Sequence, residues 1–457
     1  MKDTQYLPII GMEIHVEPKT LSKMFCECDA NHFGVTPNTH TCPVCLGLPG
    51  ALPIPNQNAI DACIKLGLAL NCKINKQSKF DRKNYFYPDL PKAYQISQYD
   101  LPFAYDGNFT FPSHLSPNEK LIQDEVGIIR IHMEEDTGKL QHVSLNEESI
   151  SLVDYNRSGV PLIEIVTRPD IHSAAQAKQF LKWLVQTITF LDISDCNMET
   201  GALRLEANIS VAQVSSGTTS ISDKDLPSYK VEVKNVNSFR YIERAIEYEI
   251  DRQIKILDQG KIPTQETRGY NENKGITFSQ RTKETAQDYR YFPEPDIPPV
   301  NTSQENIDTF QKSLNNTPYA IAKQLLKSQV RLDYAQIILQ NTQTYNKFRQ
   351  VVDLLSKQDI SQSQIAKIII NQKINLITQS ADEIVTLIKD NEKKFTLSQT
   401  EIIKVIDEII SKHPQEVEKY KQGKLSLIGF FIGQVQVQTK GQADPKSVSQ
   451  ILQTKLS

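Results

Sequence analysis

The sequence predicts an α+β fold, in which a β-rich N-terminal domain is followed by an all-α helical domain and a small α-helical tail domain. Three observations predict it: short stretches of alternating apolar and polar residues, a proline-rich break at residues 292–299, and an Ile-, Leu-, Lys- and Gln-rich composition beyond that break. The chain has 457 residues, which is too many for a single hydrophobic core. We expect domains at residues 1–298, 299–395 and 396–457.

Alternation with a period of two is typical of strands that bury one face. The first such stretch has apolar side chains at Met12, Ile14 and Val16 and polar side chains between them. Residues 203–211 and 230–234 alternate in the same way. These stretches predict half-buried strands, each with one polar face.

Two helices are predicted within the β-rich part, because apolar residues recur three and four positions apart over residues 174–191 and 239–257. Ser238 precedes the second and is its expected N-cap. Proline cannot extend a helix or lie inside a central strand, so residues 292–299 end the β-rich domain.

The charge balance restricts how the chain can contact nucleic acid. The formal net charge is −3, so any such binding needs a local basic patch. From residue 420 onward the chain has five Lys and one Asp, which makes the tail the first candidate.

A cytoplasmic location with no membrane association is expected. The first residues lack the apolar segment of a secretory signal, and no window offers about 18 uninterrupted apolar residues. The chain has seven cysteines, an odd number, which argues against a disulfide framework.

Four of the cysteines form two close pairs, Cys26 with Cys28 and Cys42 with Cys45. Four thiolates in two pairs suit a tetrahedral, structural Zn²⁺ site with no open position for substrate. The alternative is four unrelated buried thiols. The remaining cysteines are expected in the core: Cys63, Cys72 and Cys196.

Acidic residues and histidines recur on the predicted strands. Glu13 and His15 share one face of the first strand, His132 and Glu134 share a face of another, and Glu164 lies in an apolar segment. A buried carboxylate needs a partner, because an unpaired buried charge is costly. If these groups converge they can bind Mg²⁺, which prefers oxygen ligands. The alternative is a set of salt bridges on strand surfaces.

Residues 79–89, KFDRKNYFYPD, mix charged and aromatic side chains in a segment that is neither a regular strand nor a regular helix. Lys and Arg can contact phosphate, and Tyr rings can stack on bases. The run therefore indicates a loop for an anionic, aromatic ligand, with an exposed salt-bridged loop as the alternative.

Several catalytic motifs are absent from the sequence. There is no P-loop, no Ser-Ser-Lys amidase signature and no evident Cys/His nucleophile arrangement. The chain therefore has no recognisable means of releasing ammonia from an amide.

Together, eleven strings spread over the whole chain resemble one family, the B subunits of glutamine-dependent Asp/Glu-tRNA amidotransferases (GatB/GatE). The strings are GMEIHVE (11–17), SKMF (22–25), KFDRKNYFYPD (79–89), KAYQISQ (92–98), HMEEDTGK (132–139), PLIEIV (161–166), LR (203–204), KNVNSF (234–239), QETR (265–268), DYRYFPEPD (288–296) and KGQADP (440–445).

The resemblance implies that residues 1–298 form a cradle-like catalytic domain. It implies a heterotrimer with an amidase A subunit, which supplies ammonia from glutamine, and a small C subunit. The B subunit would bind ATP and mischarged Glu-tRNA(Gln) or Asp-tRNA(Asn), phosphorylate the side-chain carboxylate and bind the outer part of the tRNA through the tail.

The resemblance also implies a Mg²⁺ site at Glu13, His15, Glu135 and Glu164. It favours Glu135, whereas the alternation of the strand favours Glu134. The four paired cysteines would bind structural Zn²⁺.

For the nucleotide, the resemblance assigns Lys83 to the γ-phosphate of ATP. Arg82 and Arg157 are further candidates for the chemistry. Asn84 and Tyr85 would complete the nucleotide contacts beside Lys83.

Two rival interpretations compete with this one. An archaeal-type relative specific for Glu-tRNA(Gln) carries a large inserted domain, for which residues 154–293 leave no room. A zinc-dependent tRNA-binding module without catalysis has no need to concentrate carboxylates near an anionic ligand, as Glu13 and Glu164 do.

Overall fold

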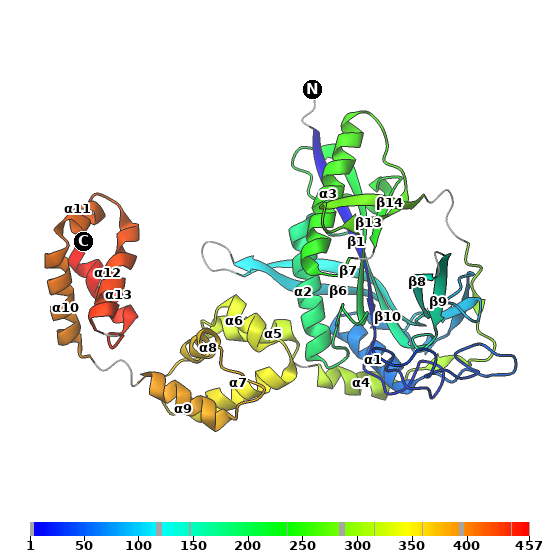
Figure 1. Ribbon diagram of the computed structural model, residues 1–457, viewed down its shortest axis with the longest axis horizontal. Helices are drawn as coiled ribbons and strands as arrows, with labels where there is room; N and C mark the ends of the chain where they lie inside the picture. The colour runs from blue at the N-terminus through cyan, green and yellow to red at the C-terminus, as the bar shows by residue number, and fades with distance from the viewer. Residues whose placement is uncertain are drawn as a thin grey trace. The chain divides into compact units, whose positions relative to one another are not determined.

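The computed structural model describes residues 4–115, 121–145, 148–234, 236–282, 288–314, 316–358, 360–392, 397–439 and 441–456. Asn235 and Lys440, each part of a string quoted above, lie outside these ranges. The contacts divide the chain into two units, Met1–Leu326 with Leu339–Thr342, and Lys327–Ile338 with Gln343–Ser457. The predicted α+β class is confirmed (Figure 1). The domain boundaries at residues 298 and 395 stay predictions.

The first unit is built on a nine-stranded mixed sheet with the order β14-β13-β12-β11-β1-β10-β7-β6-β2. Its strands are β1 (Thr4–Val16), β2 (Lys73–Ile74), β6 (Ala104–Leu115), β7 (Leu121–Glu135), β10 (Pro161–Thr167), β11 (Leu203–Ser215), β12 (Val231–Lys234), β13 (Glu266–Asn271) and β14 (Ile276–Thr282). The smaller pairings join β3 (Gln77–Ser78), β4 (Asp81–Asn84), β5 (Tyr94–Ser97), β8 (Lys139–Leu145), β9 (Glu148–Asp154), β15 (Phe292–Pro293) and β16 (Val300–Asn301).

Strand β1 lies near the middle of the main sheet, with β10 on one side and β11 on the other. Met12, Ile14 and Val16 are buried, while the polar residues between them are only partly covered. The predicted alternation is therefore confirmed. The sheet buries one set of β1 side chains in the core and leaves Glu13 and His15 together on the other face.

Both helices predicted within the β-rich part are present. They are α2 (Ala174–Phe190) and α3 (Phe239–Asp258), which pack against each other beside the sheet (Figure 1). The Ser238 side chain caps α3 by accepting a hydrogen bond from the backbone N of Tyr241, as expected.

A third helix, α1 (Gln57–Ala69), was not predicted. The Asn56 side chain caps it by accepting from the backbone N atoms of Asn58 and Ala59. Its buried stripe includes Cys63, which was expected only as a core thiol.

The proline-rich break lies against the N-terminal part of the chain. Phe292 and Pro293 form β15, which pairs with β4, and Val300 and Asn301 form β16, which pairs with β3. The residues that follow β16 form α4 (Gln304–Ser313), which contacts α1.

Beyond β16 the described regular structure is helical, in agreement with the prediction. The remaining helices are α5 (Pro318–Lys327), α6 (Leu332–Ile338), α7 (Thr342–Leu355), α8 (Gln362–Asn371), α9 (Ala381–Glu392), α10 (Gln399–Lys412), α11 (Pro414–Lys421), α12 (Ile428–Gln438) and α13 (Pro445–Leu456). None of the described helices combines the length and the apolar character needed to cross a membrane.

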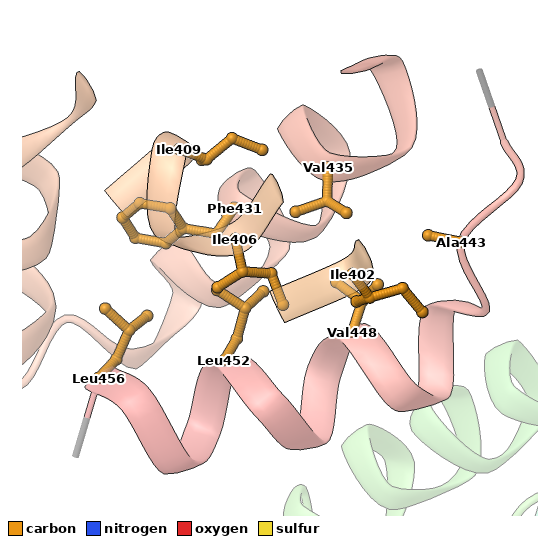
Figure 2. Packing of buried hydrophobic residues seen from close by; sticks show 9 residues of the cluster. All are labelled: Ile402, Ile406, Ile409, Phe431, Val435, Ala443, Val448, Leu452 and Leu456. Carbon is orange, nitrogen blue, oxygen red and sulfur yellow. The ribbon is translucent and has the colours of Figure 1, made fainter. Parts of the chain in front are cut away.

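The last four helices enclose a hydrophobic core of their own (Figure 2). Phe431 of α12 is fully buried against Ile406 of α10 and Leu452 of α13. Helix α10 begins with a capping box between Ser398 and Glu401, which satisfies backbone N–H groups at its N-terminus.

Candidate active site

One histidine and two glutamates meet on the polar face of the main sheet. His15 lies on β1, Glu164 on β10 and Glu134 on β7, and the strand register places His15 opposite Glu164 and Glu164 opposite His132. His15 Nε2 is 3.6 Å from Glu164 Oε2 and 3.7 Å from Glu134 Oε1. His132 Nε2 lies 3.2 Å from Glu164 Oε2.

The charges in this group perturb one another strongly. Burial lowers the pKa of His15, but the hydrogen bond and charge of Glu164 and the charge of Glu134 outweigh it and raise that pKa to about 9. Burial raises the pKa of Glu164, but His132 and His15 hold it well below its ordinary value. The carboxylates therefore favour a positive charge at His15, which a bound cation can supply in place of the proton.

Its donors fit a divalent cation. One ligand atom each from His15, Glu134 and Glu164 lie within 4.8 Å of one another. Carboxylate oxygens with one imidazole suit Mg²⁺, which usually keeps several water ligands and takes few from the protein.

A second acidic group lies next to the first. Glu13 is opposite Glu206 of β11, and Glu232 of β12 completes a set whose oxygens lie within 4.8 Å of one another. Lys234 Nζ bridges Glu206 at 2.8 Å and Glu232 at 3.2 Å, and Asn208 Nδ2 donates to Glu13 at 2.8 Å. Burial and the neighbouring carboxylates raise the pKa of Glu13.

Glu134, and not Glu135, is the carboxylate of β7 that joins His15. Successive side chains of a strand point to opposite faces, so the two glutamates separate. Glu135 accepts from Lys92 Nζ at 2.5 Å and from the backbone N of Ile96 at 2.9 Å. The structure therefore agrees with the alternation of the strand, which favoured Glu134, and differs from the resemblance, which favoured Glu135.

Lys83 of β4 lies close to the first acidic group. Burial lowers its pKa, but the charges of Glu134 and Glu164 outweigh this and hold the pKa above its ordinary value, so the ammonium stays charged. Lys83 Nζ is 5.2 Å from the ring centre of Tyr289 and 5.9 Å from that of Tyr85. A cation is therefore held between aromatic rings and carboxylates.

Arg82 points away from Lys83, because the two are neighbours on one strand. Its Nε donates to Glu294 Oε2 at 2.6 Å and its Nη2 to Glu294 Oε1 at 2.8 Å. The guanidinium also lies 4.3 Å from the ring centre of Tyr94. These contacts give Arg82 a structural partner and do not bring it to the acidic groups.

Arg157 holds the turn that follows β7. Its Nε donates to the carbonyl O of Thr137 at 2.9 Å and its Nη2 to that of Gly138 at 2.7 Å. Its Nε also lies 3.4 Å from Asp136 Oδ2. Within the part of the chain that the structure describes, no contact joins Arg157 to Lys83.

The four paired cysteines converge. The Sγ atoms of Cys26, Cys28, Cys42 and Cys45 lie within 4.8 Å of one another. A tetrahedral zinc with Zn–S bonds of about 2.3 Å needs sulfurs about 3.8 Å apart, so the group fits this ion. A hydrogen bond from Cys26 lowers the pKa of the Cys45 thiol to about 4, while burial raises that of Cys28 to about 11. One member is thus already favoured as a thiolate.

Comparison with known proteins places the whole chain in one family. Residues 8–308 match the GatB/GatE catalytic domain, and residues 308–456 match the GatB domain. The chain belongs to the GatB/GatE family. This confirms the resemblance that the sequence strings indicated.

Relatives of known name match the chain along nearly its whole length. The B subunit of the aspartyl/glutamyl-tRNA(Asn/Gln) amidotransferase of Persephonella marina is 40% identical, over 98% of this chain and 99% of that protein. The proteins of the same name from Thermotoga maritima and Trichodesmium erythraeum are both 41% identical, over 98% and 99% of this chain and 98% of each relative.

For this member of the GatB/GatE family, sequence reasoning missed part of the acidic face. Glu206 and Glu232 are polar positions of correctly predicted strands, but nothing local indicates that their strands follow β1 in the sheet. Lys234 belongs to a string that carried the resemblance, yet its contacts with both carboxylates depend on that strand order.

Proposed function

We propose that this chain is the subunit of a glutamine-dependent aminoacyl-tRNA amidotransferase that activates the side-chain carboxylate of Glu-tRNA(Gln) or Asp-tRNA(Asn). One observation carries the proposal: the Lys83 ammonium interacts electrostatically with Glu134 and Glu164, whose ligand atoms lie within 4.8 Å of each other and of His15. A permanently charged ammonium beside donors that suit a divalent cation is the arrangement that phosphoryl transfer requires.

The proposed reaction has two steps. A carboxylate oxygen of the tRNA-bound residue attacks the γ-phosphorus of ATP, ADP leaves and an acyl phosphate forms. Ammonia then attacks the acyl carbon, inorganic phosphate leaves and a proton is lost, which gives the amide. The product is Gln-tRNA(Gln) or Asn-tRNA(Asn), and the protein acts as a carbon–nitrogen ligase.

In the first step Lys83 neutralises charge on the transferring phosphoryl oxygens. Its ammonium lies 5.9 Å from the ring centre of Tyr85 and 5.2 Å from that of Tyr289. The side chain of Asn84 holds the segment of Tyr289 and Arg290 in place, because its Nδ2 donates to the backbone carbonyl O of Arg290 at 2.8 Å. Arg82 and Arg157 act at a distance, by holding the strands and turn around the site.

Mg²⁺ would be held by His15, Glu134 and Glu164, where it supplies charge neutralisation for the phosphates of ATP. Glu13 would hold a cation together with Glu206 and Glu232. The cysteine group is proposed to bind Zn²⁺ in a structural role, since four thiolates leave no open ligand position.

The second step needs a source of ammonia. The chain carries no amidase signature, which supports a partner A subunit that hydrolyses glutamine, with a small C subunit as the third member. The Lys-rich segment after residue 420 supports a tRNA-binding role for the tail. A cytoplasmic location is proposed because protein synthesis uses the product there.

The test uses the assembled enzyme with its amidase and C subunits, and ammonium chloride in place of glutamine. Lys83→Ala should lower the rate of ATP-dependent amide formation on Glu-tRNA(Gln) by about 100-fold or more. Lys73→Ala removes an exposed lysine paired with Asp106 and should leave the rate unchanged.

Amide formation at the wild-type rate in Lys83→Ala would exclude the phosphate role of this lysine. Binding of tRNA without ATP-dependent amide formation by the wild-type complex would favour the non-catalytic tRNA-binding module instead.

A further inference from the structure

A row of aromatic rings leads from Lys83 toward solvent. We name Tyr85, Tyr87, Tyr289 and Tyr291 the tyrosine rim. The ring centres of Tyr85 and Tyr87 are 6.5 Å apart, those of Tyr85 and Tyr289 are 6.0 Å apart, and those of Tyr289 and Tyr291 are also 6.0 Å apart. Interplanar angles of 61°, 70° and 72° show edge contacts, so the rim is not a closed stack.

The outer end of the rim is accessible. Tyr87 is 56% exposed, whereas Tyr85 and Tyr289 are partly buried beside the Lys83 ammonium. The exposed ring of Tyr87 offers stacking surface to a ligand that reaches Lys83 from outside.

The segment that carries Tyr289 is held in a strained conformation. Arg290 has φ +46°, in the left-handed region that favours glycine. Asn84 stabilises this turn, because its backbone N donates to the carbonyl O of Tyr289 at 3.0 Å and its side chain to that of Arg290. Strain that is held by specific contacts is common at ligand sites.

The same turn leaves a cation free for a ligand. The Arg290 side chain is 83% exposed, and within the described part of the chain its ion pair is a long one, 3.7 Å from Nε to Asp288 Oδ2. A guanidinium presented in this way beside aromatic rings combines a phosphate contact with base stacking.

We propose that the tyrosine rim and Arg290 bind the single-stranded 3′ end of the aminoacyl-tRNA and guide its aminoacyl group to Lys83. The inference rests on the proposed function for its substrate. The terminal base of the tRNA and the base of ATP are both adenine, and either can stack on tyrosine. The exposure of Tyr87 and Arg290 favours a polynucleotide end, because small-ligand pockets bury most of the ligand.

The test measures binding of a minihelix RNA with a single-stranded 3′ end to the assembled enzyme. Tyr87→Ala should weaken binding roughly 5- to 100-fold, as expected for loss of stacking with one base, and Tyr87→Phe should bind as wild type. The position is mostly exposed, so these substitutions leave the core intact.

Arg290→Asn removes the guanidinium and keeps a residue type that tolerates positive φ. It should weaken binding several-fold and reduce the slope of log K against log salt by about 0.7, the value for one phosphate contact with a single strand. Arg331→Asn, at another exposed arginine, should leave both quantities unchanged.

Two controls separate the possible outcomes. A minihelix without its single-stranded end should bind wild type and Tyr87→Ala equally, and KM for ATP should not change. A raised KM for ATP with unchanged RNA binding would assign the rim to the nucleotide and overturn the proposal. An equal loss of affinity for the minihelices with and without the single-stranded end would also overturn it. Failure of the wild-type enzyme to form amide would contradict the proposed function, whereas normal amide formation with unaltered RNA binding by Tyr87→Ala contradicts this inference alone.

Discussion

Arg82 and Glu294 form a two-point ion pair across 212 residues of sequence, with Nε–Oε2 at 2.6 Å and Nη2–Oε1 at 2.8 Å. The Glu294 side chain is fully buried, and that of Arg82 is 22% exposed. The pair fastens β15 to β4, and so brings the segment with Tyr289 beside the strand that carries Lys83.

Loss of this pair should destabilise the first unit. Arg82→Ala leaves the buried Glu294 carboxylate without its main partner, which should lower the free energy of unfolding by about 3–5 kcal/mol. The measurement is urea unfolding followed by the fluorescence of Trp183, which is buried in α2 of the same unit. Arg168→Ala, at an arginine that is 45% exposed, is the control and should cost at most about 1 kcal/mol. Equal costs for the two variants would contradict the structural role given to Arg82.

The two neighbouring glutamates of β7 should differ in function. Glu134→Gln removes a donor beside His15, so the Mg²⁺ concentration that gives half-maximal amide formation should rise at least about 10-fold. Glu135→Gln weakens the contact with Lys92 and should leave this concentration unchanged. A Mg²⁺ titration of the assembled enzyme compares them. A shift in Glu135→Gln without one in Glu134→Gln would restore the assignment that the resemblance favoured.

The sequence could predict what is encoded locally. The alternation of β1 placed Glu13 and His15 on one face, and the alternation of β7 favoured Glu134 over Glu135, which is where the structure has it. Helix α1 was missed, and its buried face includes Gly67, a residue that disfavours a helix interior.

The remainder depends on contacts between distant segments. Glu206 and Glu232 join Glu13 only because β11 and β12 follow β1 in the sheet. No spacing in the chain indicates that Glu294 pairs with Arg82. Arg82 was therefore predicted as a candidate for the chemistry and not as a structural ion-pair partner. The cysteines were predicted together because each pair is close in sequence, and the loop between the pairs is short.

Lys234 should act as the internal counter-ion of the second acidic group. Lys234→Met leaves Glu206 and Glu232 unbalanced, which should cost roughly 2 kcal/mol, between the values for exposed and for fully buried pairs. Because a divalent cation can replace the lost ammonium, Mg²⁺ should raise the Tm of this variant more than that of wild type. Thermal unfolding with and without Mg²⁺ tests this, with Lys73→Met as the control. An equal response to Mg²⁺ in variant and wild type would exclude replacement of the Lys234 ammonium by a divalent cation.

Zinc should be present and should stabilise the loops that carry the cysteines. Elemental analysis of the purified protein should give about one zinc per chain, since four thiolates form one tetrahedral site. Cys42→Ser should lose the metal and lower Tm, because the ion joins the segment of Cys26 and Cys28 to that of Cys42 and Cys45. Cys63→Ala, at a buried cysteine of α1 outside the group, should keep the metal.

The ammonia-dependent rate measured below the Tm of Cys42→Ser should stay within a few-fold of wild type, because a closed four-thiolate site offers substrate no ligand position. Well under one zinc per chain in the wild type would exclude the zinc site, and a large loss of rate in folded Cys42→Ser would give the metal a role in the chemistry.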